Sequence, residues 1–89
     1  MLLSSAGNVR TLRVVAPGAR RVELMGDFTE WNAVPLDQVA KDTWEMTLRI
    51  APGTYRLSVR LNGGAWGPPP GIPSQSDEFN GVVGVVVVR

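Results

Sequence analysis

The strongest constraint on this sequence is a series of short runs in which apolar and polar residues alternate, with proline and glycine between the runs. Alternation with a period of two is typical of a strand that buries one face, and Pro and Gly mark the turns between such strands. The clearest run is 43–50, in which every second residue is apolar: Trp44, Met46, Leu48 and Ile50. In 54–61 the same alternation turns Arg56 away from the apolar face.

These runs predict a chain made of strands, with no convincing helix. We expect strands over 9–15, 20–25, 43–50, 54–61 and 82–88, and a short edge segment over 33–37. Residues 37–42 resemble a polar connection, 67–73 a proline-rich loop, and Gly84 a bulge in the last strand. Several short strands with regular turns between them predict an all-β fold, an immunoglobulin-like β-sandwich of about seven strands.

The length of the chain limits it to one folded unit. A chain of 89 residues makes a single domain, and we expect the β-sandwich over 9–89. We expect 1–8 to form a flexible leader. Its apolar stretch is too short for a signal peptide. No window reaches the ~18 apolar residues that a membrane helix requires.

The composition argues against several classes of function. Nine basic and eight acidic residues give a net charge of +1, without the basic excess of nucleic-acid-binding proteins. With neither histidine nor cysteine, the chain lacks the usual general base, the usual zinc ligand and any thiolate. We therefore expect no metal, no cofactor, no nucleic acid and no membrane as partners. The absence of cysteine fits a cytoplasmic location.

Asp27 and Glu30 are the nearest candidates for a catalytic pair of carboxylates. They lie three residues apart in a loop, and nothing in the sequence indicates that either one is removed from water. A turn aspartate and a surface glutamate are a far commoner use of such loop acids. We therefore predict that the domain is not an enzyme.

The three tryptophans fall into two groups. Trp44 lies on the apolar face of a predicted strand, where it belongs to the core. Trp31 and Trp66 lie in predicted loops, among glycine, asparagine and charged residues. Two interpretations remain open for these loop tryptophans: each ring folds back to cover one end of the core, or each contacts a ligand.

Arg56 favours the ligand interpretation, although a solvated strand arginine is the commoner case. It points away from the apolar face on the strand that leads to Trp66, so two indoles and one cation can share an outer surface. Flat apolar rings with a few fixed donors suit a sugar ring, whose faces carry C–H groups and whose edge carries hydroxyls. Asn32 is a second donor candidate, and Asn32 and Asp27 can instead bond the backbone of their loop.

At these residues the sequence resembles carbohydrate-binding module family 48, which includes the glycogen-binding domain of the AMP-activated protein kinase β subunit. The resemblance spans about 9–88 and is strongest over the stretch Val22–Asn32 with Val34-Pro35-Leu36. Trp44, Pro52–Arg56 and the turn before Trp66 support it. The resemblance implies an early-set immunoglobulin-like β-sandwich that binds α-1,4-linked glucan without cleaving it.

The resemblance also implies roles for individual residues. Trp31 and Trp66 match the two tryptophans that stack on sugar, and Arg56 falls where the family often has a sugar-contacting lysine. Phe79 falls near an apolar residue that packs on the ligand. The asparagine expected before the last strand is absent, and Asn80 fills its place only with a shifted loop.

Two further departures from the family pattern follow the strand that contains Arg56. The hairpin Asn62–Ala65 before the second tryptophan is longer than the usual Val-Asp-Gly, and Pro68, Pro69 and Pro70 replace the usual Asp-Pro. We expect α-glucan as the partner, together with partner domains of a larger parent protein. The alternative is a structural or protein-interaction β-sandwich that has lost sugar binding.

Overall fold

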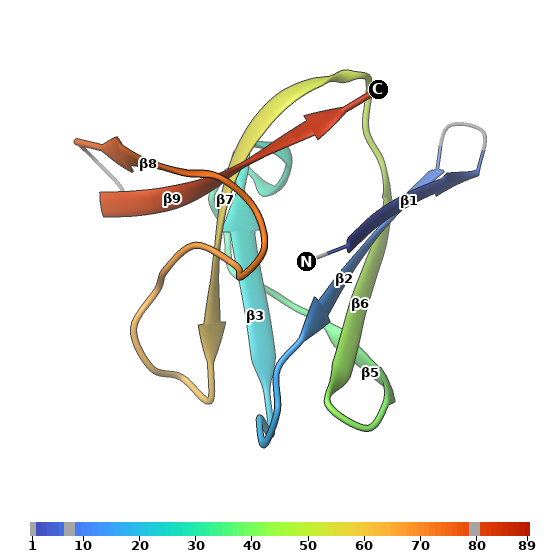
Figure 1. The fold of residues 1–89 in the computed structure, drawn as a ribbon, viewed down its shortest axis with the longest axis vertical. Coiled ribbons are helices and arrows are strands. Elements are labelled where there is room, and N and C mark those ends of the chain that lie inside the picture. Colours follow the sequence, from blue (N-terminus) through green and yellow to red (C-terminus); the bar gives the residue numbers. More distant parts are fainter. Residues whose placement is uncertain (1, 7–8, 79–80) are drawn as a thin grey trace.

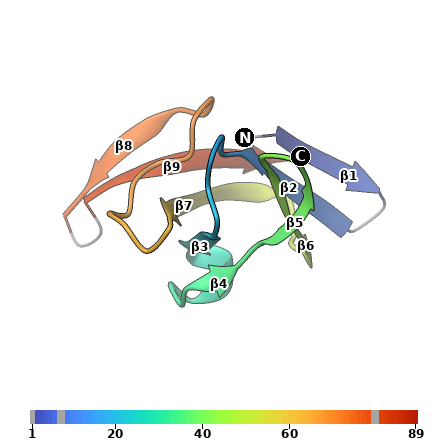
Figure 2. The ribbon, with the colours of Figure 1, turned by 90° about the horizontal axis from the view of Figure 1, so that it is seen from below.

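Two antiparallel sheets packed face to face form the domain (Figure 1). The computed structural model describes residues 2–6, 9–78 and 81–89. One sheet, the β2 sheet, has the order β1 (Leu2–Ala6), β2 (Val9–Val15), β6 (Thr43–Arg49) and β5 (Asp37–Ala40). The other, the β7 sheet, has the order β4 (Val34–Pro35), β3 (Val22–Gly26), β7 (Gly53–Leu61), β9 (Gly81–Val88) and β8 (Ser74–Asp77). A turn of 3₁₀ helix, η1 (Asp27–Thr29), links β3 to β4, and η1 and β4 lie at one edge of the sandwich (Figure 2).

The core lies between the sheets and takes alternate residues from each of them. The β2 sheet contributes Leu12, Val14 and Trp44, and the β7 sheet contributes Val22, Leu24, Leu57, Val59 and Val86. Trp44 is only 6% exposed, which confirms its predicted place in the core. Burial of these apolar side chains is the main stabilising term for so small a domain. The architecture confirms the predicted immunoglobulin-like β-sandwich.

The five strands predicted from the sequence are present within one or two residues as β2, β3, β6, β7 and β9. Three further strands, β1, β5 and β8, were not predicted. Every residue of β5 is exposed, so this strand has no apolar face and gives no alternating pattern. Within residues 1–8, expected as a flexible leader, Leu2–Ala6 form β1 and pair with β2 in antiparallel register.

Gly84 is not a bulge, and that prediction was wrong. It pairs in regular register with Leu57 of β7 and with Ser74 of β8. Glycine is required there because a Cβ atom would lie 2.9 Å from Cδ of Pro69 and 2.6 Å from Cδ1 of Ile72. Pro69 is buried and Ile72 packs against the core, so the proline-rich loop closes onto the sheet at this glycine.

We expect Gly84→Ala to destabilise the domain by about 1–3 kcal/mol, because the rigid Pro69 ring must move to admit a methyl group. Urea denaturation followed by tryptophan fluorescence measures the change. Gly67→Ala is the matched control: a Cβ atom at this position would meet nothing within 4 Å. The control should change stability by less than about 0.5 kcal/mol, and an equal loss in both variants would contradict the packing argument.

Candidate functional site

The outer face of β7 carries a row of polar side chains. Leu57 and Val59 face the core, so Arg56, Ser58 and Arg60 point the other way. The orientation predicted for Arg56 is therefore confirmed. One tryptophan lies near each end of this row, Trp31 by Arg56 and Trp66 by Arg60, and both are half-buried.

The loop after β3 holds Trp31 in an uncommon backbone conformation. Thr29 and Gly26 close the loop with reciprocal bonds: Gly26 N donates to Thr29 Oγ1 at 2.9 Å, and Oγ1 donates to Gly26 O at 3.1 Å. The Trp31 N–H also donates to Gly26 O at 3.0 Å. Glu30 and Trp31 have φ angles of 54° and 58°. Consecutive left-handed residues other than glycine are strained, and such strain concentrates at functional sites.

Asp27 joins Trp31 to Arg56. Its Oδ2 accepts the Arg56 backbone N–H at 2.8 Å, and its Oδ1 accepts the Trp31 indole N–H at 3.2 Å. The Arg56 guanidinium lies 3.4 Å from Oδ1. Desolvation raises the pKa of Asp27, but the hydrogen bonds from Arg56 and Trp31 and the Arg56 charge outweigh it, so the pKa is lowered. Asp27 therefore accepts a backbone N–H, as expected, but that N–H belongs to Arg56 on β7 and not to the loop of Asp27 itself.

Trp66 lies at the opposite end of the row. Gly67 forms a two-bond bridge with Val59, with N···O distances of 2.8 and 3.0 Å, so Trp66 stands beside Arg60 across this pairing. The Arg60 guanidinium carbon lies 4.7 Å from the centre of the Trp66 ring, a cation–π contact. Arg60 also donates to both carboxylate oxygens of Glu23, at 2.9 and 3.2 Å.

The arginines beside the two tryptophans set the length of the row. Arg56 and Arg60 are four residues apart on one strand, which corresponds to about 13 Å. Between them Ser58 is fully buried, opposite the half-buried Met25 of β3. The centre of the face is therefore covered, and the groups that a ligand can reach lie towards its two ends.

The remaining predicted site residues are Asn32, Phe79 and Asn80. Asn32 is exposed, and its side-chain Nδ2 donates to Thr29 O at 3.1 Å. Phe79 and Asn80 lie outside the described residues. Glu23 and Arg60 were missed as site residues, although their opposite charges at outward positions of two predicted strands were visible in the sequence.

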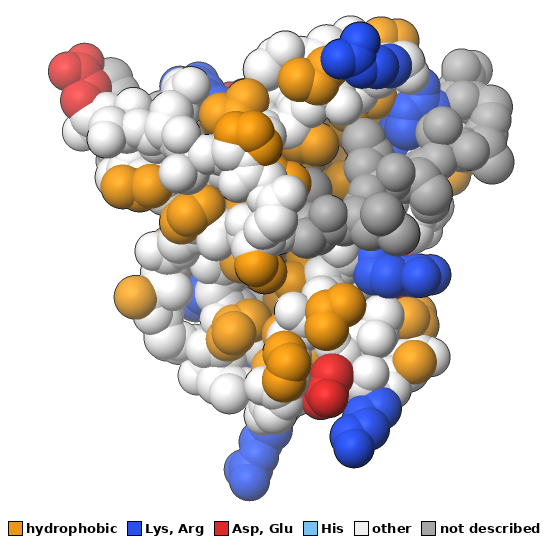
Figure 3. Space-filling view, in the orientation of Figure 1, with side chains coloured by type: hydrophobic (Ala, Val, Ile, Leu, Met, Phe, Trp, Pro, Cys, Tyr) orange, Lys and Arg blue, Asp and Glu red, His pale blue; other side chains and the backbone are white. Residues whose placement is uncertain are grey.

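An apolar hollow of about 500 Å³ opens at the end of the sandwich where Arg60 and Gly67 lie. Its walls come from the β2–β3 turn, the end of β7 and the proline-rich loop: Val14, Val15, Ala16, Pro17, Val59, Arg60, Leu61, Ala65, Gly67, Pro68 and Pro70. Neither Trp31 nor Trp66 lines it. Basic side chains are scattered over the face seen in Figure 3 and form no continuous patch there. In the described part of the chain, no three His, Cys, Asp or Glu residues gather as metal ligands, and no helix could cross a membrane.

Comparison with known families decides the classification. A family profile described as carbohydrate-binding module 48 (isoamylase N-terminal domain) matches residues 4–77. The chain belongs to carbohydrate-binding module family 48. The predicted resemblance is confirmed, and family 48 domains are non-catalytic modules. A search of curated proteins finds no sequence match to this chain.

Solved structures agree with this family 48 assignment at the level of the fold. A structure titled as a putative alpha amylase from Salmonella typhimurium superposes with a TM-score of 0.73 and 20% identity, over 97% of this chain and 14% of that chain. A maltogenic amylase from S. marinus gives a TM-score of 0.72 and 16% identity, over 91% of this chain and 13% of that chain. The chain thus corresponds to about one seventh of these proteins.

The ionised carboxylate of Asp27 should contribute stability that is lost in acid. Because its pKa is lowered on folding, the contribution is fully present above the unfolded-state pKa of about 3.9 and is lost as pH falls through the folded-state value. We expect Asp27→Asn to flatten the fall in unfolding free energy below about pH 4, measured by urea denaturation at a series of pH values. Val39→Ala, which truncates an exposed apolar side chain of β5 and removes no charge, should keep the wild-type slope. An unchanged slope in Asp27→Asn would show that the Arg56 and Trp31 bonds do not act on this group.

Proposed function

We propose that this domain binds α-1,4-linked glucan through its β7 sheet, with Trp31 and Trp66 as stacking platforms. The observation that carries the proposal is that both half-buried indoles are anchored at the ends of one outward row, each beside an arginine. Flat apolar surfaces with a few oriented polar groups are the usual pattern of small-ligand recognition. Membership of family 48 supports a carbohydrate as that ligand.

The polar groups have matching roles. The Arg56 side chain is 43% exposed and fixed at its base by Asp27, so it can direct donors at sugar hydroxyls near Trp31. Asn32 Oδ1 and the ligand-facing side of Arg56 supply an acceptor and donors at the same end. Phe79 and Asn80, which the family resemblance assigns to the ligand, belong to the same proposal.

The spacing of the platforms indicates an oligomeric ligand. The arginines beside the two tryptophans lie about 13 Å apart along β7, which is longer than one sugar ring, so a chain of linked rings is the ligand best able to reach both ends of the row. An open platform of this kind gives modest affinity, with a Kd of roughly 10⁻³–10⁻⁵ M, or about 4–7 kcal/mol.

The domain would serve as a tether in a longer protein. The amylase structures it superposes on are about seven times its length, which supports a parent protein that acts on α-glucan with a catalytic unit elsewhere in its chain. The module itself would bring that unit to the polymer and contribute no catalytic group. We infer a cytoplasmic location, with which the absence of cysteine agrees.

Titration with maltoheptaose or β-cyclodextrin tests the proposal. Both ligands should change tryptophan fluorescence, and Trp31→Ala and Trp66→Ala should each weaken binding at least tenfold, about 1.4 kcal/mol, because each removes one platform. Maltose should bind much more weakly than maltoheptaose, since it is too short to span the two ends.

Two controls make the result specific. Val39→Ala truncates an exposed apolar side chain of β5, on the other sheet, and should leave affinity unchanged. Cellohexaose offers the same sugars in β-linkage and should bind poorly. Wild-type protein that responds to neither α-glucan would reject the proposal in favour of a protein-interaction module.

A further inference from the structure

We propose that Arg60, held by Glu23, is a positioning residue that orders the Trp66 ring from behind and leaves its opposite face for the ligand. The β3–β7 register and the contact between Arg60 and the Trp66 ring bring Glu23, Arg60 and Trp66 into one stack. The inference rests on the proposed glucan binding and adds that Arg60 holds one of the two stacking tryptophans in place.

The stack begins with the pairing of two strands. Antiparallel register places Glu23 of β3 directly opposite Arg60 of β7, on the outer face. The guanidinium donates through Nε and Nη2 to the two carboxylate oxygens, at 2.9 and 3.2 Å. A two-point contact of this kind fixes the plane of the guanidinium as well as its position. The side chains of Glu23 and Arg60 are 14% and 29% exposed, so neighbouring groups confine the pair.

Backbone bonds hold the chain on both sides of Trp66, but they do not fix its side chain. The bridge between Val59 and Gly67 fixes the main chain beside Trp66, but the preceding turn through Asn62, Gly63 and Gly64 is exposed. The fixed guanidinium lies over the ring, with 4.7 Å between its carbon and the ring centre. Arginine stacks well on aromatic faces because it is planar and weakly hydrated.

The charges of the pair favour the same arrangement at neutral pH. Hydrogen bonds from Arg60 lower the pKa of Glu23 against an opposing effect of desolvation, with smaller contributions from the charges of Arg60 and Arg21. Arg21 lies 3.4 Å from Glu23, but its side chain is 61% exposed, so it is the looser partner. Glu23 therefore stays ionised at neutral pH, and the contact that holds Arg60 over the Trp66 ring is kept there.

An ordered ring binds more tightly than a mobile one because its rotamer freedom is not lost on binding. Glu23→Gln removes the charge that fixes Arg60, and Arg60→Gln removes the planar cation itself. Each change should increase the motion of the Trp66 indole and weaken glucan binding by about three- to tenfold. Arg60→Lys, which keeps the charge and loses the planar group, should give an intermediate effect.

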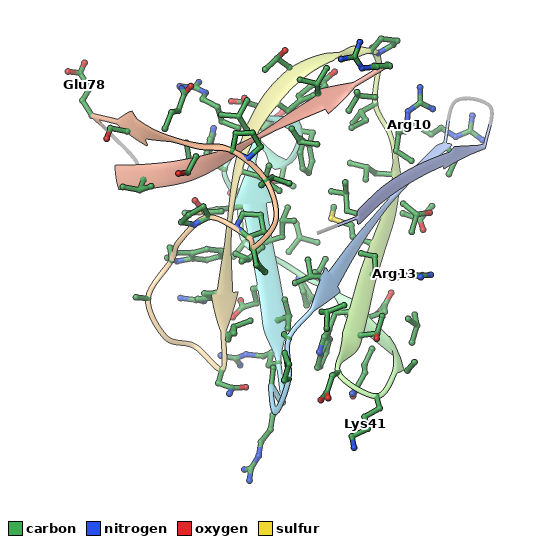
Figure 4. All side chains as sticks on the ribbon, in the orientation of Figure 1. Arg10, Arg13, Lys41 and Glu78 are labelled. Carbon is green, nitrogen blue, oxygen red and sulfur yellow. The ribbon has the colours of Figure 1, made fainter. Side chains whose placement is uncertain are left out.

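The domain contains a matched pair for comparison. Arg13 and Glu45 face each other across β2 and β6 on the outer side of the other sheet, with 2.6 Å between Nε and Oε2. Arg13 points away from the sandwich (Figure 4), and no tryptophan ring among the described residues stacks on it. Glu45→Gln and Arg13→Gln therefore remove the same kind of cross-strand pair without touching Trp66.

The decisive measurement is the heteronuclear ¹H–¹⁵N NOE of the Trp66 indole N–H, in the free protein and with maltoheptaose, with the signal assigned from Trp66→Phe. We expect the NOE in the free protein to fall in Glu23→Gln and Arg60→Gln, and to stay at the wild-type value in both control variants. Urea denaturation confirms that each variant is folded, and Arg60→Lys replaces Arg60→Gln if the latter does not fold.

Each outcome decides the matter. A lower NOE together with weaker glucan binding supports the positioning role. A lower NOE in a protein that binds no glucan rejects the proposed function but leaves Arg60 as the support of Trp66. An unchanged NOE in Glu23→Gln and Arg60→Gln overturns the positioning role, whatever happens to the affinity.

Discussion

The register between β3 and β7 determines which side chains meet on the outer face, because it pairs Met25 with Ser58 and Glu23 with Arg60. The same ladder, continued by one residue, brings Asp27 to the Arg56 backbone N–H. A slip of one residue would turn every one of these side chains to the opposite face. At Gly26 the strands approach so closely that a Cβ atom would lie 2.7 Å from Arg56 O. Both anchored tryptophans depend on this one pairing.

The fold could be predicted from the sequence wherever a strand buries one face. Alternation located β2, β3, β6 and β7, because a strand that buries one face places an apolar side chain at every second position. The continuous valine-rich run of 82–88 located β9. Neither pattern could locate β1, β5 or β8, which lie at the edges of their sheets. An edge strand such as β5, exposed along its length, is held in the sheet by backbone hydrogen bonds. Backbone hydrogen bonds do not require a particular order of apolar and polar side chains.

The candidate site was predictable in part for a related reason. The period of a strand was enough to turn Arg56 outward, and the scarcity of tryptophan singled out Trp31 and Trp66. The acids that bond to Arg56 and Arg60 could not be assigned without the strand register. The register places Glu23 beside Arg60, which lies 37 positions away in the sequence. The strain at Glu30 and Trp31 also followed from loop closure by Thr29 and not from residue type.

With the Arg60 guanidinium over one face of the Trp66 ring, a ligand can stack only on the other face. Any partner of that ring must settle onto the sheet from outside and cannot be clamped between two rings. For a polymer, this means that neither end has to thread through an enclosure. An internal stretch of a long chain would dock as readily as a terminus, and the number of docking positions would increase with the length of the polymer.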